Sequence, residues 1–168
     1  IYVLNTDIDR VIKNVIDSFT EKILLNKPLI WSPDNPNLYK VQVQLYHRKK
    51  LLDSYTCNIG FRKFEATTKG FKLNGKFLKL IGVNRHQDWK ELGNAVPIEK
   101  QLEDMVIIKK MGSNFLRLAH YPQDRAIYNA ADSLGIILWS EIPIVNKVPI
   151  YTDYQEFKRN TLQMQHEH

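Results

Sequence analysis

The spacing of apolar and polar residues predicts β-structure in the first part of the chain. Residues 40–46 (KVQVQLY) carry apolar side chains at alternate positions, which is the pattern of a half-buried antiparallel strand. Residues 54–61 form the expected partner strand, and the basic cluster at residues 47–50 between them is typical of a solvated hairpin turn. Residues 31–37 contain two prolines and two asparagines and predict a turn before this hairpin.

The segments on either side of this hairpin differ in how clearly they predict a structure. Residues 7–27 show partial helical spacing but many β-branched residues, so we predict irregular structure that ends in a strand at residues 21–25. Residues 70–78 contain Asn74-Gly75 between alternating apolar positions. This dipeptide predicts a β-hairpin, because both central residues of its turn need a positive φ.

After residue 78 the pattern alternates between strands and helices. Short apolar runs predict strands at residues 78–83, 114–118 and 136–139, the last covered on both faces because it is continuously apolar. Apolar residues at spacings of three and four predict two intervening helices, through Ile98, Leu102, Met105, Ile108 and Met111 and through Ile127, Ala130, Ala131 and Leu134. Gly112 and Gly135 stand just past the C-terminal ends of these helices, a position at which glycine is common. Residues 151–165 predict a third helix.

This alternation predicts a parallel sheet whose strands are joined by helices. Three such strands fit either half of a doubly wound sheet or the start of an eight-stranded barrel. Residues 83–86 and 119–122, which follow two of the strands, contain no glycine. The missing glycine-rich loop disfavours dinucleotide binding.

Composition limits the class of protein. The 168 residues are 43% hydrophobic and 11% aromatic, which is enough apolar material for an ordered globular chain. No apolar run approaches the ~20 residues of a membrane helix, and the N-terminus lacks the features of a signal peptide. We therefore expect a soluble chain with no membrane partner, whose compartment stays open.

Charge and cysteine content exclude further classes. The net charge of +6 is compatible with nucleic-acid binding, but the basic residues are scattered, so we expect no nucleic-acid partner. The single cysteine, Cys57, excludes an internal disulfide and a cysteine-based zinc site. We expect neither a metal nor a cofactor.

Candidate functional residues lie where the predicted parallel strands end. The residues concerned are Arg85, His86, Asp88, Arg117, His120, Trp139 and Glu141. Active sites of parallel α/β folds lie at the carboxyl ends of the strands, so these side chains should converge on one face. Imidazoles, a guanidinium, carboxylates and an aromatic ring together suit a polyhydroxylated ligand such as a sugar.

Each of these residues also has an ordinary structural interpretation. Arg117 inside an apolar strand is compatible with a buried ion pair, with Glu141 as its partner. A single histidine is more often a satisfied core or surface residue than a ligand contact, and a single Trp such as Trp139 is more often core. The functional interpretation rests on all three strands ending in such residues at the same end.

Four short motifs occur in order along the chain: residues 73–76 (LNGK), 82–86 (GVNRH), 117–122 (RLAHYP) and 139–143 (WSEIP), with residues 29–39 and 60–62 upstream. Together they resemble glycoside hydrolase family two, which contains β-galactosidases, β-glucuronidases and β-mannosidases. The resemblance implies a partial immunoglobulin-like β-sandwich over residues 1–65 and the first three βα units of a TIM barrel over residues 66–168. Both domains are expected to be incomplete, since a full barrel takes ~250 residues.

The forms NRHQD and WSEIP are most similar to the β-galactosidase type. The resemblance implies a retaining glycosidase that cleaves terminal β-galactosides, with an acid/base Glu and a nucleophile Glu. Glu141 matches neither, so both catalytic residues are expected beyond residue 168. A β-glucuronidase, a β-mannosidase or a non-enzymatic carbohydrate-binding remnant are the alternatives.

The resemblance also implies roles for single residues. His86 and His120 would line the sugar subsite, and Arg117 would orient the nucleophile. Four further residues would hold these side chains in position without contacting the sugar themselves: Arg85, Asp88, Trp139 and Glu141. Residues 142–145 replace the Glu-x-His pair that binds magnesium in some β-galactosidases, so no metal site is expected. The implied partners are a glycoside substrate and the remainder of the hydrolase polypeptide, with a homo-oligomer possible.

Overall fold

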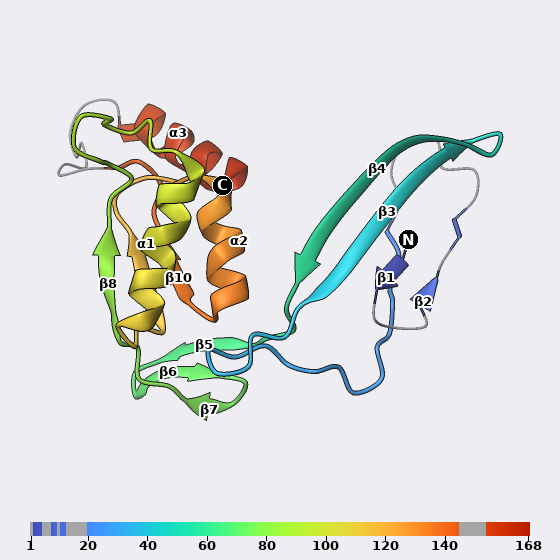
Figure 1. Ribbon diagram of the computed structural model, residues 1–168, viewed down its shortest axis with the longest axis horizontal. Coiled ribbons are helices and arrows are strands. Elements are labelled where there is room, and N and C mark those ends of the chain that lie inside the picture. The colour runs from blue at the N-terminus through green and yellow to red at the C-terminus, as the bar shows by residue number, and fades with distance from the viewer. Residues whose placement is uncertain (1, 5–7, 10, 13–19, 145–153) are drawn as a thin grey trace. The chain divides into compact units, whose positions relative to one another are not determined.

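The computed structural model describes residues 2–4, 8–9, 11–12, 20–144 and 154–168 (Figure 1). The chain divides into two compact units, Ile1–Phe77 and Leu78–His168. The sequence-based division at residue 65 stays a prediction, and each unit is described by itself.

The first unit contains a four-stranded antiparallel sheet in the order β2-β1-β3-β4. Its strands are β1 (Tyr2–Leu4), β2 (Ile8–Asp9), β3 (Tyr39–His47) and β4 (Lys50–Ile59). The predicted hairpin is confirmed: β3 pairs with β4, and Arg48 and Lys49 form the turn with φ values of 44° and 68°.

The prediction for residues 7–27 is wrong in two places. Residues 21–25 form no strand, and β2 lies inside the segment that we expected to be irregular. A two-residue strand offers no periodicity, so only its pairing with β1 identifies it. The predicted irregular stretch at residues 13–19 lies outside the described residues.

A second, three-stranded sheet in this unit confirms the predicted Asn-Gly hairpin. It consists of β5 (Phe64–Thr67), β6 (Gly70–Leu73) and β7 (Lys76–Phe77). Asn74 and Gly75 turn the chain with φ values of 52° and 79°. The Asn74 side chain also donates a 3.0 Å hydrogen bond to the carbonyl of buried Trp31, so this turn is anchored to the segment before β3.

The second unit is the predicted parallel sheet, with the order β10-β9-β8. In chain order its elements are β8 (Gly82–Arg85), α1 (Ile98–Lys110), β9 (Phe115–Leu118), α2 (Arg125–Leu134), β10 (Ile137–Ser140) and α3 (Tyr154–Glu167). The first strand begins at Gly82 rather than at the predicted residue 78. The helix predicted in residues 151–165 is confirmed from residue 154 onward, and residues 151–153 lie outside the described residues.

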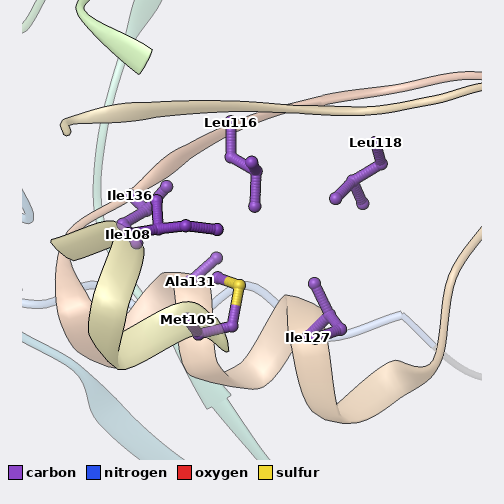
Figure 2. Close-up of a cluster of buried hydrophobic side chains, with 7 residues drawn as sticks. All are labelled: Met105, Ile108, Leu116, Leu118, Ile127, Ala131 and Ile136. Atoms are coloured by element: carbon purple, nitrogen blue, oxygen red, sulfur yellow. The ribbon is translucent and has the colours of Figure 1, made fainter. Parts of the chain in front are cut away.

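Helices α1 and α2 pack on one face of this sheet and enclose its core (Figure 1). Figure 2 shows the buried cluster, in which side chains of the two helices lie opposite those of β9 and Ile136: Met105, Ile108, Leu116, Leu118, Ile127, Ala131 and Ile136. Because these residues come from different elements, the cluster fixes the helices against the strands and holds the strand ends in place.

The predicted apolar face of α1 is only partly correct. Met105 and Ile108 are buried as expected, but Ile98, Leu102 and Met111 are exposed. The buried face begins instead at Gln101, whose amide donates to the carbonyl of Val96. Periodicity identified the helix but placed its inner face slightly wrongly, because apolar residues occur on more than one side.

Strand register separates the two faces of the parallel sheet. Three rows of paired residues show this: Val83, Leu116 and Leu138 next to the helices, Arg85, Leu118 and Ser140 on the same side, and Asn84, Arg117 and Trp139 on the opposite side. Trp139 is 59% exposed. The expectation that the third strand is covered on both faces is therefore wrong among the described residues.

Gly82 allows β8 to lie close to β9. A Cβ at this position would meet the carbonyl oxygen of Phe115 at 1.8 Å. No side chain fits such a distance, so glycine is required where the first strand joins the sheet.

Candidate functional site

Arg117 and Glu141 form an ion pair at the carboxyl ends of neighbouring strands. Arg117 lies in β9, and Glu141 directly follows β10. The Arg117 Nε donates to Glu141 Oε1 at 2.7 Å, and Nη2 donates to Oε2 at 3.0 Å. Both carboxylate oxygens are therefore held by one planar guanidinium, which is the strong bidentate geometry.

His120 completes this cluster. Its Nδ1 lies 3.0 Å from Arg117 Nη2 and 3.1 Å from Glu141 Oε2. The peptide bond between Ala119 and His120 is cis. The side chains of Arg117, His120 and Glu141 retain 33%, 37% and 21% of their exposure, so the cluster is accessible to a ligand.

The Glu141 carboxyl has a lowered pKa. The hydrogen bonds from Arg117 are the largest cause, and the contact with His120 and the positive charge of Arg117 act in the same direction against a smaller opposing effect of burial. A general acid needs a raised pKa, and a nucleophile needs a free oxygen. The lowered pKa of Glu141 and the bonds on both its oxygens suit an ion-pair partner of Arg117, and the expectation that Glu141 is not a catalytic carboxylate stays a prediction.

His86 and Tyr121 extend the cluster with aromatic rings. The ring of exposed His86 lies edge-on to that of His120, with 5.4 Å between the centroids, and Tyr121 lies 6.0 Å from His86. The Tyr121 hydroxyl accepts a 3.1 Å hydrogen bond from the backbone of Gln87. This bond connects the loop after β8 with the loop after β9.

Arg85 does not join these residues, and the expectation that all the strand-end residues converge is wrong for it. Its side chain is 6% exposed and lies on the helix-facing side of the sheet. There it donates to Asp104 of α1 at 2.9 and 3.1 Å, and to Gln123. Arg85 lies next to Asn84 along the strand, so it points to the opposite face.

Asp88 and Trp139 are the other two residues to which the resemblance assigns a supporting role. Asp88 is exposed in the loop after β8. Trp139 occupies the sheet position beside Arg117, on the same face. The roles that the resemblance implies for these residues stay predictions.

The sequence interpretation missed two glutamines that hold the loops of the site. Gln87 accepts from the backbone of Asp124 at 2.7 Å, and Gln123 donates to the Arg85 carbonyl at 2.8 Å. Gln87 lies inside the NRHQD motif and Gln123 directly follows RLAHYP, but a glutamine in a loop carries no pattern that separates a loop-holding side chain from a solvated one.

Within the part of the chain that the structure describes, no cluster of three or more His, Cys, Asp or Glu residues is arranged to hold a metal ion. No helix there is long and apolar enough to span a membrane.

Comparison with known proteins identifies two consecutive family matches. Residues 3–62 match the model "Glycosyl hydrolases family 2", and residues 64–163 match "Glycosyl hydrolases family 2, TIM barrel domain". The second match alone covers more than half of the chain.

Relatives that carry two different enzyme names support this assignment. A β-glucuronidase of Bacteroides fragilis is 43% identical over 125 residues, covering 73% of this chain and 18% of the relative. A β-galactosidase of Thermoanaerobacter pseudethanolicus is 39% identical over 140 residues, covering 82% and 18%. The chain therefore spans less than a fifth of the length of these relatives.

A solved structure gives the same result. Bacteroides uniformis β-glucuronidase 2, covalently bound to cyclophellitol-6-carboxylate aziridine, matches with a TM-score of 0.75 and 41% identity. The match covers 83% of this chain and 17% of that one. By sequence and by fold, the chain belongs to the glycosyl hydrolases family 2.

Proposed function

We propose that this chain supplies the sugar-subsite side of a retaining glycoside hydrolase that cleaves terminal β-galactosides. The observation that carries the proposal is the Arg117–His120–Glu141 cluster, with His86 beside it, at the carboxyl ends of parallel strands. This is the edge at which α/β enzymes bind their substrates.

The cluster suits recognition of hydroxyl groups rather than bond cleavage. His86 and His120 offer ring nitrogens that donate to or accept from hydroxyls. Arg117 would orient a carboxylate of the catalytic pair, and its guanidinium is held in place by Glu141. In a retaining enzyme the catalytic carboxyls lie about 5–5.5 Å apart. The two catalytic Glu residues belong, in this proposal, to polypeptide beyond residue 168.

A β-glucuronide is the second candidate substrate. The B. fragilis relative and the B. uniformis structure are both named β-glucuronidases, whereas the T. pseudethanolicus relative is named a β-galactosidase. The two substrates differ in the configuration of the C4 hydroxyl and in the substituent on C5, which is a hydroxymethyl group in the galactoside and a carboxylate in the glucuronide. A pocket separates such a pair through few contacts at these two positions.

The test is a hydrolysis assay on the complete polypeptide that contains this chain. Aryl β-galactoside, β-glucuronide and β-mannoside are compared at equal concentrations, and the anomer of the first product is followed by NMR. The proposal expects the highest kcat/KM for the galactoside and retention of configuration. A preference for the glucuronide would replace the substrate class, and an inverted product would contradict the mechanism.

A second assay separates the hydrolase from a carbohydrate-binding remnant. The 168-residue chain is titrated with galactose and incubated with the aryl galactoside. The proposal expects no enzyme-like turnover from this chain alone. Galactose binding by the chain, with no hydrolysis by any longer polypeptide that contains it, would favour the remnant.

A further inference from the structure

Three atoms of the Arg117–His120–Glu141 cluster form a nearly equilateral triangle. Arg117 Nη2 lies 3.0 Å from Glu141 Oε2 and 3.0 Å from His120 Nδ1, and the last two atoms are 3.1 Å apart. Arginine only donates, and an ionised carboxylate only accepts. The neutral imidazole carries one proton, so Nδ1 either accepts from Arg117 or donates to Glu141.

The donor count permits donation to Glu141. Arg117 already gives one hydrogen bond to each carboxylate oxygen. If Nδ1 carries the proton, Oε2 accepts two hydrogen bonds and Oε1 one, which is within the capacity of a carboxylate. The short distance between the nitrogens of Arg117 and His120 then follows, because both donors converge on the same oxygen.

The opposite tautomer leaves an unfavourable contact. A bare Nδ1 would place its lone pair 3.1 Å from the anionic Oε2 with no proton between them. Glu141 is only 21% exposed, so solvent compensates poorly for such a contact. The lowered pKa of Glu141 keeps this carboxylate ionised near neutral pH.

We propose that Glu141 is a positioning residue that holds neutral His120 in the tautomer protonated on Nδ1 and leaves Nε2 as a hydrogen-bond acceptor. Resting on the proposed function, this fixes the polarity of the subsite: a sugar hydroxyl donates to His120 and does not accept from it. A group that accepts but has no proton to give, such as an ether oxygen, is then rejected at this position.

The tautomer is read directly by NMR of the full 168-residue chain labelled with ¹⁵N in its histidine rings. Comparison with His120→Gln assigns the signals, and the pH is raised until the imidazole is neutral. Wild-type His120 is expected to show a protonated Nδ1 and an unprotonated Nε2. In Glu141→Gln the ratio of the two tautomers should move toward protonated Nε2 by at least about tenfold, the size of one lost hydrogen bond to a charged acceptor.

Two further variants separate this effect from a general loss of charge or fold. Glu141→Asp keeps the carboxylate and should retain the wild-type tautomer. Glu156→Gln removes the same charge from an exposed pair with Arg159 on α3, whose atoms lie 3.8 Å apart, and should change nothing at His120. If Glu141→Gln fails to fold, the wild-type spectrum and Glu141→Asp still decide.

Protonated Nε2 in the wild type would overturn the inference, as would an unchanged ratio in Glu141→Gln or an equal shift in Glu156→Gln. No sugar is present in this experiment. If the expected tautomer is found but the complete polypeptide has no hydrolase activity, only the proposed function is contradicted. If the complete polypeptide is an active hydrolase but the opposite tautomer is found, only the role of Glu141 is contradicted.

Discussion

The Arg85–Asp104 and Arg117–Glu141 pairs have the same chemistry but lie on opposite faces of one sheet. Arg85 is buried between the sheet and the helices, where Asp104 and Gln123 satisfy its guanidinium. Arg117 lies on the other face, where its own side chain is 33% exposed, and His120 lies beside it. Arg85–Asp104 is called the closed pair here, because its guanidinium is buried out of reach of a ligand. Arg117–Glu141 is the open pair, because its guanidinium can be reached, and this difference separates a fold element from a candidate site.

The largest expected effect tests the closed pair. Asp104→Ala leaves the Arg85 guanidinium buried without its anion, and breaking a buried pair costs about 3 kcal/mol of unfolding free energy. A urea titration followed by helical circular dichroism measures this, because all the described helices lie in the second unit. Glu141→Ala should lower the unfolding free energy less, because the Arg117 side chain that it leaves unpaired is 33% exposed and can be solvated. Equal losses in the two variants would remove the distinction between the pairs.

The open pair is tested next through activity. In the complete hydrolase, His120→Ala should lower kcat/KM about 100-fold, since a ligand hydrogen bond and its partner group are lost together. Its unfolding free energy should change by less than about 1 kcal/mol. His47→Ala, an exposed histidine at the end of β3, is the matched control and should retain full activity. An unchanged kcat/KM in His120→Ala would exclude His120 from the site.

A smaller effect follows from the pKa of Glu141. Arg117 lowers this pKa in the folded state below its ordinary value of 4.5, so the ionised carboxylate stabilises the fold above that value. This contribution is lost as the pH falls through the lowered pKa. Urea titrations between about pH 6 and about pH 3 should therefore show a shallower loss of stability in Glu141→Gln than in the wild type. Parallel curves would show that the pair does not titrate with folding.

The sequence predicted the secondary structure of the second unit better than it predicted which faces are covered. Helices α1 and α2 and the parallel strands were found from periodicity, and the ends of both helices from Gly112 and Gly135. Local pattern does not report what covers a face, so the inner face of α1 and the exposure of Trp139 were predicted wrongly. The same limit applies to the site. Arg85 lies within a motif of the site, yet a strand alternates its side chains and sends this one toward Asp104.

The smallest expected effect compares the two faces directly. Trp139 and Leu118 lie on adjacent strands, with Trp139 on the open face and Leu118 in the core beneath the helices. In the 168-residue chain, Trp139→Ala should change the unfolding free energy by less than about 0.5 kcal/mol, because most of the ring is already solvated. Leu118→Ala, as the reference, should cost about 3 kcal/mol through transfer and cavity terms. If Trp139→Ala cost as much as Leu118→Ala in the same titration, the face that carries Arg117 would be a packed surface. A ligand would then have to displace protein to reach it.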